Sequence, residues 1–543
     1  MRKHLRQFAA RRGAVIAVAC LGIFAAALAV RVYDLEQTPP GLYFDEALNG
    51  VDASKAVATG DYRLWYPDHN GREGLFINLQ TLSVRAFGHE PWALRLVAAV
   101  VGAAVVAGIF LLGYMMFPGR RGALAGVAAA AMAGFGFWHL ALSRVGFRAT
   151  LVGLVVVWFL VLLLVALRRD RGSAEAGRWR WRRYAWWAAA GAVFGLGLHT
   201  YPAFRGAGLI VLVAIAGSYR SIGNRRDWAL GWAAFAVGGL VTAGPMLVHF
   251  LQYPEHLRSR QELAVWNTSD PWATWLSGVK ETALMFTGPG DCNPRHNFPC
   301  RAQLHPVTAV LAGVGLVVCL AGMFRRPADG WRRLSSGLPL VGLVAMLVPV
   351  TLTADALPHA LRALGAAPFA YLLAGLGAAV IGQWLYGLRT AFALQTAAVA
   401  ALVAAILWAA VDDTRLYFDG WPERVDTGTP FSMGLVEQAR FLESRPGRHY
   451  LVFEPDRPLA RADGLSVAAA VSQFLLWDEW QAGRLVYVLT GEVPELEVDK
   501  PAVVGVIRSG VTGGPDPVMA ELASRYPDGR VISGPGGQPY FVR

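Results

Sequence analysis

Two adjacent carboxylates, Asp45 and Glu46, follow the first long apolar stretch of the chain and open a polar segment that ends near Pro91. Dehydrating such a pair at the edge of a membrane is costly, so its presence calls for a chemical reason. A positioned carboxylate can serve as a general base, here on a substrate held at a membrane surface. The alternative is an ordinary pair of solvated loop carboxylates.

The composition places this pair in a polytopic membrane protein. Of 543 residues, 55% are hydrophobic and only 16% are charged, and the mean hydropathy is +0.39. A helical span needs about 20 apolar residues, and the chain offers about eleven stretches close to that length. We expect spans near 14–32, 92–117, 122–142, 149–167, 185–201, 203–218, 228–250, 306–323, 338–353, 364–384 and 390–410. The first is long enough to be a retained span rather than a cleaved signal peptide.

Lysine and arginine predict how the spans are oriented. Basic residues cluster on alternate connections, at 2–12, 120–121, 168–183, 220–226 and 325–333. By the positive-inside rule that side is cytoplasmic, in a multi-pass protein of the plasma (inner) membrane. The segments 33–91 and 251–305, and everything after about 411, are then extracytoplasmic. The net charge of +12 is mostly this topology signal and does not indicate nucleic-acid binding.

Three short outer connections carry arginine, although the same rule disfavours it there. These arginines are Arg144, Arg148, Arg205 and Arg362, and the last two share their connections with His199, Tyr201 and His359. Each arginine abuts an apolar span, where a desolvated charge needs a partner. A guanidinium binds phosphate through two parallel hydrogen bonds, so we predict a shared site for an anionic headgroup. The alternative is that these side chains reach out to bulk lipid headgroups.

The first outer segment has helical patterning of its own. We predict a juxtamembrane helix that Asp45 and Glu46 begin, within 41–60, and an amphipathic interfacial helix over 74–88. Aromatic and polar residues lie between the two helices, and they suit sugar binding as well as an ordinary interfacial aromatic belt. The polar residues in question are Asp68, His69, Arg72 and Glu73.

The four cysteines fit an oxidising exterior. Cys20 and Cys319 fall inside apolar spans, whereas Cys292 and Cys300 share the loop 290–300. We predict a disulfide between Cys292 and Cys300. Zinc binding with His296 is the alternative, although the spacing of a four-ligand site is missing.

Taken together, the acidic pair, the two juxtamembrane helices and the string from Leu357 to Pro368 resemble the GT-C superfamily of membrane glycosyltransferases. The chain is most similar to the bacterial branch related to protein O-mannosyltransferases and the lipid A aminoarabinose transferase (glycosyltransferase family 39-like). The segments 71–77 and 293–297 also match recurrent strings of that branch. The resemblance covers roughly residues 14–410. Many relatives carry a Pro-Pro pair where this chain has Glu73-Gly74, so their substrates are not carried over.

The resemblance implies an inverting transfer of a sugar from a polyprenyl phosphate to an acceptor on the outer face of the membrane. It implies that Asp45 is the general base and that Glu46 orients acceptor or sugar. Arg362 is the first choice for the donor phosphate, with Arg205, Arg148 and Arg144 as further choices. Substrate contacts are expected from His199, Tyr201, Asp68, His69, Arg72, Glu73, His296 and His359. Some relatives use a divalent cation (Mg, Mn or Ca), for which Asp45, Glu46, Asp68 and His69 could supply ligands.

After about residue 411 the pattern changes to that of a small α/β domain. Strands are predicted at 449–453, 485–489, 502–507 and 540–542, and helices at 431–444, 465–482 and 516–526. We therefore expect a GT-C membrane domain over 1–410 and an extracytoplasmic α/β domain over 411–543. The alternative function is a transporter or flippase of a lipid-linked sugar, although repeated halves with discontinuous helices are not evident. The sequence leaves open the sugar, the acceptor (protein, glycan or lipid), the metal requirement and the oligomeric state.

Overall fold

A computed structural model describes residues 2–172, 180–219, 222, 224–258, 261–325, 330–389, 391–455, 461–507 and 516–543. Parts of the basic segments at 168–183, 220–226 and 325–333 fall outside these ranges. The chain divides into two compact units. Residues 1–33 and 98–419 form the helical unit, and residues 34–97 and 420–543 form the mixed unit. Residues 34–97 thus group with the C-terminal residues.

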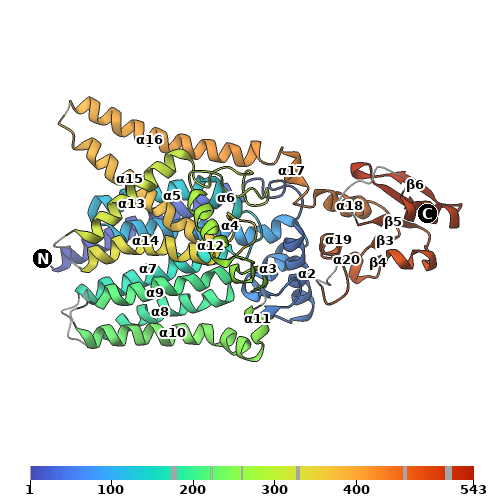
Figure 1. Ribbon diagram of the computed structural model, residues 1–543, viewed down its shortest axis with the longest axis horizontal. Coiled ribbons are helices and arrows are strands. Elements are labelled where there is room, and N and C mark those ends of the chain that lie inside the picture. Colours follow the sequence, from blue (N-terminus) through green and yellow to red (C-terminus); the bar gives the residue numbers. More distant parts are fainter. Residues whose placement is uncertain are drawn as a thin grey trace. The chain divides into compact units, whose positions relative to one another are not determined.

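The helical unit consists of long helices that lie side by side (Figure 1). They are α1 (Arg2–Val32), α5 (Gly119–Phe135), α7 (Thr150–Gly172), α8 (Arg180–Leu196), α9 (Ala207–Tyr219), α10 (Arg225–Gln252), α13 (Pro306–Phe324), α14 (Gly330–Thr351), α15 (Ala367–Tyr386) and α16 (Phe392–Arg415). Helix α4 (Pro91–Met116) begins in the mixed unit and continues into this one. Shorter helices are α6 (Phe137–Leu142), α11 (Pro254–Arg258) and α12 (Pro271–Leu284).

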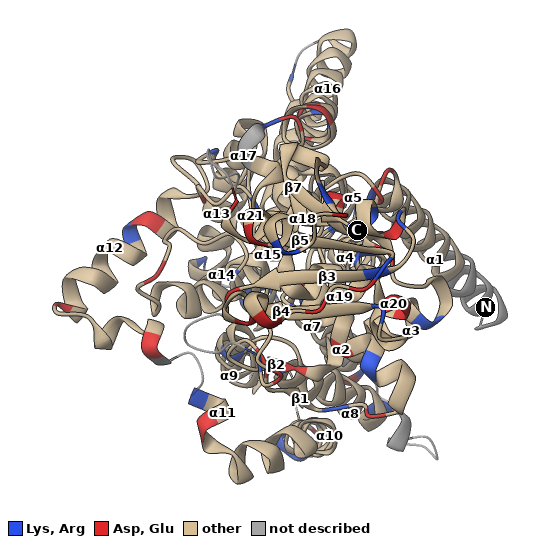
Figure 2. Ribbon diagram, turned by 90° about the vertical axis from the view of Figure 1, so that its right-hand side faces the viewer, with Lys and Arg blue, Asp and Glu red and all other residues tan. Residues whose placement is uncertain are grey.

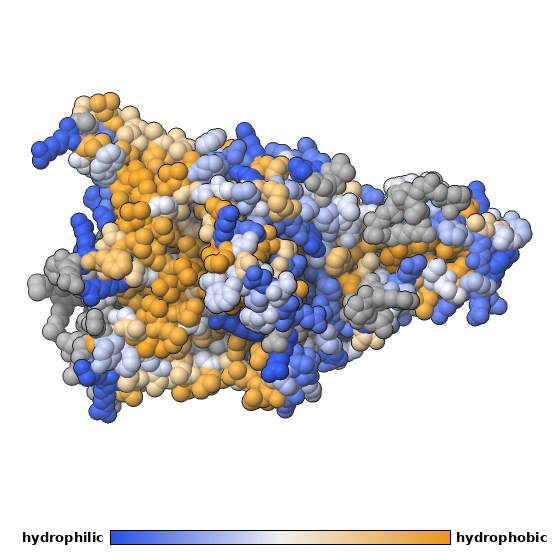
Figure 3. All heavy atoms as spheres, in the orientation of Figure 1, coloured by the Kyte–Doolittle hydropathy of each residue, from blue (hydrophilic) through white to orange (hydrophobic). Residues whose placement is uncertain are grey.

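The apolar character of these helices confirms a polytopic helical membrane protein. Among the described residues, nine helices are long and apolar enough to cross a membrane. Helices α5 and α8, with 17 residues each, match the two other expected spans. The expected span over 122–142 is interrupted at Gly136, between α5 and α6. Figure 3 shows the helices of this unit covered by hydrophobic side chains over much of their length, as lipid contact requires.

The mixed unit contains the two predicted juxtamembrane helices and an α/β domain. Helices α2 (Phe44–Thr59) and α3 (Gly74–Phe87) flank a short hairpin of β1 (Trp65–Tyr66) and β2 (Arg72–Glu73). The C-terminal sheet has the order β4-β3-β5-β7-β6, and Figure 2 shows the first four strands in this order. Its strands are β3 (Arg448–Phe453), β4 (Leu485–Leu489), β5 (Ala502–Val506), β6 (Arg530–Ser533) and β7 (Pro539–Val542). Strand β3 pairs in parallel with β4 and β5, and β7 pairs antiparallel with β5 and β6.

Helices complete this domain and confirm the predicted α/β class. They are α17 (Val425–Gly428), α18 (Met433–Glu443), α19 (Ala469–Leu475), α20 (Trp477–Gln481) and α21 (Pro517–Arg525). Strand β6 was not predicted, because only one of its residues is even half-buried and its apolar pattern is weak. The parallel pairs β3–β4 and β3–β5 give the sheet a core strand that is buried from His449 to Phe453.

One hydrophobic core joins α2 to the C-terminal helices. Leu48 and Val51 of α2, Leu94 at the start of α4, and Phe474 of α19 belong to a single buried cluster. A Cβ added at Gly50 would lie 2.6 Å from Cδ2 of Phe474, so glycine is what lets α2 approach this ring. The helix that carries the acidic pair therefore depends on the C-terminal residues for its packing.

Replacing Phe474 by Ala should destabilise the mixed unit. The ring is fully buried, and removing a buried phenyl group costs about 3–5 kcal/mol because a cavity remains. Tyr62→Ala is the matched control, since Tyr62 is 50% exposed. Unfolding of both purified variants would be followed by tryptophan fluorescence, and equal stabilities would contradict the shared core.

Candidate active site

Asp45 lies in the first turn of α2, where the helix dipole favours a negative charge. Its side chain is 34% exposed, and its Oδ1 lies 3.1 Å from Nε2 of His69. His69, Asn70 and Gly71 all have positive φ (53°, 64° and 77°), which makes the tight turn between β1 and β2. This turn is what brings His69 to Asp45. The pair therefore combines a partly exposed carboxylate, whose Oδ1 is itself buried, with the imidazole of His69.

Glu46, in contrast, is fully buried and fully engaged. Its Oε1 lies 3.2 Å from Nε of Arg95 and its Oε2 lies 3.2 Å from Nη2 of the same residue. Oε2 also accepts the backbone N–H of Tyr43. Arg95 in turn donates to the carbonyl oxygens of Pro39 and Gly41, both at 2.7 Å. These contacts hold the entry to α2 and direct Glu46 to the protein interior.

The other polar residues of this segment also hold backbone or helices together. Arg72 is buried and donates to Oδ1 of Asn49 and Oδ2 of Asp52, at 2.7 and 2.5 Å. Burial raises the pKa of Asp52, and Arg72 opposes that rise. Asp68 accepts the backbone N–H of Ala462 at 2.9 Å. Glu73 is buried at the start of α3.

In the helical unit, a disulfide-linked loop organises a second polar cluster. Cys292 and Cys300 are joined by a disulfide with a Cα–Cα distance of 4.1 Å. The carboxylate of Asp291 accepts the backbone N–H groups of Asn293 and Ala360, each at 2.8 Å, and Nδ1–H of His296 at 3.0 Å. One buried carboxylate thus ties this loop to the turn that carries His359 and Arg362.

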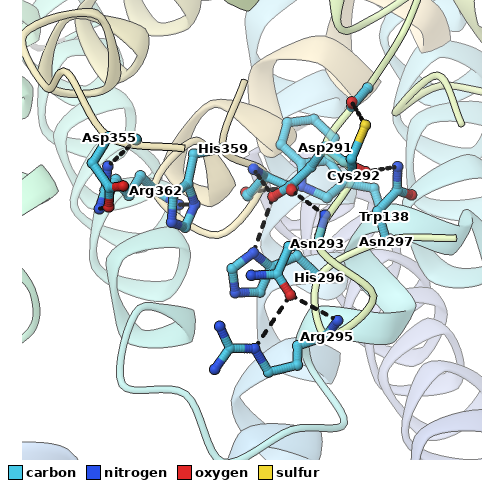
Figure 4. Close-up of polar contacts among 12 residues, drawn as sticks. Trp138, Asp291, Cys292, Asn293, Arg295, His296, Asn297, Asp355, His359 and Arg362 are labelled. Carbon is cyan, nitrogen blue, oxygen red and sulfur yellow. Dashed lines mark hydrogen bonds and ion pairs between the residues drawn. The ribbon is translucent and has the colours of Figure 1, made fainter. Parts of the chain in front are cut away.

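The imidazole rings of His296 and His359 face each other in this cluster, with centroids 4.8 Å apart (Figure 4). Burial lowers the pKa of His296, and Asp291 only partly offsets this while Arg295 and Arg362 reinforce it. Burial also lowers the pKa of His359 well below its usual value, with His296 and both arginines adding to the effect. Both rings are therefore neutral at pH 7.

Two guanidinium groups border the same rings. Arg362 donates to Oγ1 of Thr353 at 3.1 Å and to the carbonyl of Asp355 at 2.9 Å, and pairs with the Asp355 carboxylate at 3.2 Å. Nε of Arg295 donates to Oδ1 of Asn293 at 3.2 Å. In Figure 4 Arg295 passes below the ring of His296, and Arg362 lies beside His359 with its guanidinium at Asp355. The cluster therefore places two guanidiniums, with the carboxylates of Asp291 and Asp355, around neutral rings.

Asp291, His296 and His359 lie close enough together to bind a metal ion, but the guanidiniums beside them disfavour a cation. Ligand atoms of Asp291, His296 and His359 lie within 4.8 Å of one another. The Asp291 carboxylate already accepts three hydrogen bonds, and two guanidiniums oppose a divalent cation. With Cys292 and Cys300 in a disulfide, neither thiolate is left for zinc. The guanidiniums can donate to an anion, whereas they repel a divalent cation.

Two of the other predicted arginines, Arg144 and Arg205, donate to groups outside this cluster. Arg144 is buried and donates to the carbonyls of Val30 and Arg31 and to the hydroxyl of Tyr417. Exposed Arg205 donates to the carbonyl of Leu257. These contacts connect helices and loops within the helical unit.

Arg148, Tyr201 and His199 complete the set of predicted positions. The guanidinium of Arg148 lies 5.2 Å from the centroid of the Tyr201 ring, a cation–π arrangement. Nε2 of His199 lies 2.9 Å from the carbonyl of Thr242, so this ring connects to α10.

Sequence reasoning missed Asp291, Arg295 and Arg95. Asp291 directly precedes Cys292, and Arg295 directly precedes His296. Their position in a short loop between two cysteines was the signal that could have identified them as site residues. Arg95 stands within an apolar stretch, four residues after Pro91, where a charge without a partner would be costly. That cost was the signal for a buried acidic partner, which is Glu46.

Comparison with solved structures identifies this architecture. ArnT from Cupriavidus metallidurans bound to undecaprenyl phosphate superimposes with a TM-score of 0.53 at 15% identity, over 96% of this chain and 97% of that one. The chain has the GT-C fold. The apo state of the same ArnT gives a TM-score of 0.51 at 13% identity, over 98% of both chains.

A second GT-C protein shows the same likeness. Archaeal oligosaccharyltransferase AglB from Archaeoglobus fulgidus, in complex with an inhibitory peptide and a dolichol-phosphate, gives a TM-score of 0.50 at 13% identity. That likeness covers 96% of this chain and 74% of AglB. No family model and no curated protein matches the sequence. At these identities the likeness establishes the GT-C fold and leaves the chemistry to the residues.

The loop disulfide gives a direct chemical prediction. Alkylation under non-reducing conditions, followed by mass analysis, should find Cys292 and Cys300 protected and linked in protein from an oxidising compartment. After reduction both should react, and loss of the link should disturb the 251–305 loop without unfolding the spans. Free reaction of both cysteines before reduction would contradict the disulfide.

Proposed function

We propose that this protein is an inverting membrane glycosyltransferase that moves a sugar from a polyprenyl phosphate to an acceptor on the outer face of the membrane. The observation that carries this proposal is the GT-C fold, matched over nearly the whole chain to a protein bound to undecaprenyl phosphate. The dolichol-phosphate in the AglB complex points to the same class of donor.

In this proposal Asp45 is the general base. Its carboxylate takes the proton of the acceptor hydroxyl while the acceptor oxygen attacks the anomeric carbon of the sugar. The partial exposure of Asp45 supports this assignment, because a substrate can reach the carboxylate. The position in the first turn of α2 also favours the ionised form that a base requires.

Glu46 holds Asp45 in place in this proposal and does not contact substrate. Both of its oxygens are engaged by Arg95, and its side chain is fully buried. We therefore change the role expected from the family resemblance, in which Glu46 orients acceptor or sugar. For the same reason Glu46 is a poor choice for a metal ligand.

The donor phosphate is assigned to Arg362 and Arg295. The bond between the anomeric carbon and the phosphate oxygen breaks during transfer, and negative charge grows on the departing polyprenyl phosphate. Fixed guanidinium groups stabilise that charge more in the transition state than in the ground state. Nη2 of Arg362 reaches the Asp355 carboxylate, which is 54% exposed, so a phosphate can replace this partner without leaving Asp355 unsolvated. Arg148 and Arg205 remain second choices, and Arg144 is committed to backbone carbonyls.

A transporter or flippase of a lipid-linked sugar is the alternative, and one assay separates the two. The purified protein would be given mannose-, glucose- and arabinose-type polyprenyl phosphates. A transferase releases polyprenyl phosphate and consumes the donor, whereas a transporter moves the donor intact. Retention of every donor, with acceptor-containing membranes present, would count against transfer.

Asp45→Asn should lower turnover by roughly 10²–10⁴-fold while leaving the fold intact, because the group is half-exposed. Glu46→Gln is the companion variant. It should lower stability by about 3–5 kcal/mol, because it leaves the Arg95 charge buried and unpaired, with a smaller loss of turnover per folded molecule. Donor turnover and thermal unfolding of both variants make the check. Near-normal turnover of a folded Asp45→Asn protein would remove Asp45 as the base.

Arg362→Ala should weaken donor binding and slow transfer together, by about 2–5 kcal/mol for a desolvated charge pair. Arg362→Lys should restore only part of this, since an ammonium lacks the guanidinium fork. Arg440→Ala, at a salt bridge with a 41% exposed arginine side chain, is the control and should leave affinity unchanged. Donor affinity in nanodiscs gives the readout. Full rescue by Lys, or unchanged affinity in Arg362→Ala, would point to simple contact with bulk lipid headgroups.

A further inference from the structure

His296 and His359, the two facing histidines of the helical unit, have no role in the sugar transfer proposed for Asp45, Arg295 and Arg362. His296 and His359 are 5% and 9% exposed and come from two different loops, and their ring planes are tilted by 31°. Burying two imidazoles beside two guanidiniums is costly unless the arrangement serves a purpose. Their hydrogen bonds show which nitrogen atoms are available.

The proton positions on both rings follow from their partners. The Asp291 carboxylate can only accept, so Nδ1 of His296 carries a hydrogen and Nε2 has a lone pair. The backbone N–H of Arg362 can only donate, so Nδ1 of His359 accepts and Nε2 carries the hydrogen. His296 can therefore take up one proton at Nε2.

Four charged groups are identified around the two rings. Among the described residues, the loop 290–300 contributes Asp291 and Arg295, and the turn after α14 contributes Arg362 with its partner Asp355. The ring of Phe147, after α6, also borders His296, with its centroid 5.9 Å from that of the imidazole. Two positive and two negative groups give no net charge. A phosphate dianion would bring two uncompensated negative charges to this place.

We propose that His296 is a proton-coupled partner of the phosphate group. A phosphate that binds beside Arg295 and Arg362 brings one proton onto Nε2 of His296, and the site loses that proton when the phosphate leaves. This inference rests on the proposed function, because it concerns the same phosphate site. The ligand class is a phosphate monoester dianion.

Asp291 makes His296 the proton acceptor of the pair. Its carboxylate stabilises the imidazolium through Nδ1–H, whereas Nδ1 of His359 is already occupied by the Arg362 N–H. A second proton on His359 would place two cations with ring centroids 4.8 Å apart, which opposes double protonation. In the empty site, burial lowers the pKa of His296, so the ring is neutral. The approaching dianion raises that pKa and draws the proton in.

Calorimetry can count this proton. Farnesyl phosphate and inorganic phosphate would be titrated into the full-length protein in detergent at pH 8, in Tris and in HEPES. These buffers differ in ionisation enthalpy, so the difference in observed heat gives the number of protons exchanged. A phosphate monoester, with a second pKa of about 6, is already a dianion at pH 8 and takes up none itself. We expect an uptake of about one proton per phosphate bound, and an affinity that falls about threefold to tenfold from pH 8 to pH 9.

Matched variants separate this coupling from phosphate binding alone. His296→Gln should still bind phosphate, about tenfold more weakly, with proton uptake near zero. Asp291→Asn keeps the ring but removes its stabilising carboxylate, so uptake should also fall. His449→Gln replaces another buried histidine, whose pKa is likewise lowered by burial, and should keep both affinity and uptake.

The possible results separate proton uptake by His296 from phosphate binding itself. Binding by the wild-type protein without proton uptake would overturn the coupling and leave the proposed transferase untouched. Uptake that persists in His296→Gln would overturn the assignment to His296. Failure of both phosphates to bind would overturn the phosphate site itself. Equal affinity for farnesyl phosphate and inorganic phosphate would contradict a lipid-linked ligand, which we expect to bind at least about tenfold more tightly.

Discussion

The buried guanidinium of Arg95 is the constraint on which the candidate base depends. It satisfies both oxygens of Glu46 and the carbonyls of Pro39 and Gly41, so the end of the first outer connection, the start of α2 and the start of α4 meet at one charge. A buried charge is tolerated only with such complete partnering. Because Glu46 is held inward, its neighbour Asp45 is directed to the wet side of the same helical turn. The chemistry of one carboxylate thus follows from the burial of the other.

The polar cluster around Asp291 also depends on one buried and fully hydrogen-bonded carboxylate. Asp291 is buried with three donors on its carboxylate, and these donors tie the disulfide loop to the turn before α15. The groups around it, His296, His359 and Arg362, keep hydrogen-bonding capacity for a ligand. In both units a fully partnered acidic residue fixes the backbone, and less buried neighbours carry the proposed chemistry. For this reason, replacing Glu46 should mainly lower stability, whereas replacing Asp45 should mainly lower turnover.

The C-terminal residues have a role in the packing of residues 34–97. Phe474 of α19 fills the space that Gly50 leaves on α2, and Ala462 donates its N–H to Asp68 beside the His69 turn. The α/β domain is therefore part of the support for Asp45 as well as a domain in its own right. This gives a physical reason for the C-terminal domain to share one chain with residues 34–97.

The sequence by itself determined the membrane class, the long helices, the two juxtamembrane helices and most of the C-terminal strands. Those features depend on local hydropathy and periodicity, which a sequence displays directly. It also singled out Asp45, His359 and Arg362 as polar groups beside apolar spans, and His296 through its loop between two cysteines; their roles stay predictions. Only the tertiary structure decided that Glu46 pairs with Arg95, that Arg144 binds backbone carbonyls, and that Asp291 joins two distant loops. Those outcomes depend on which groups meet across 49, 114 and 69 positions of the chain, and no local pattern encodes such a meeting.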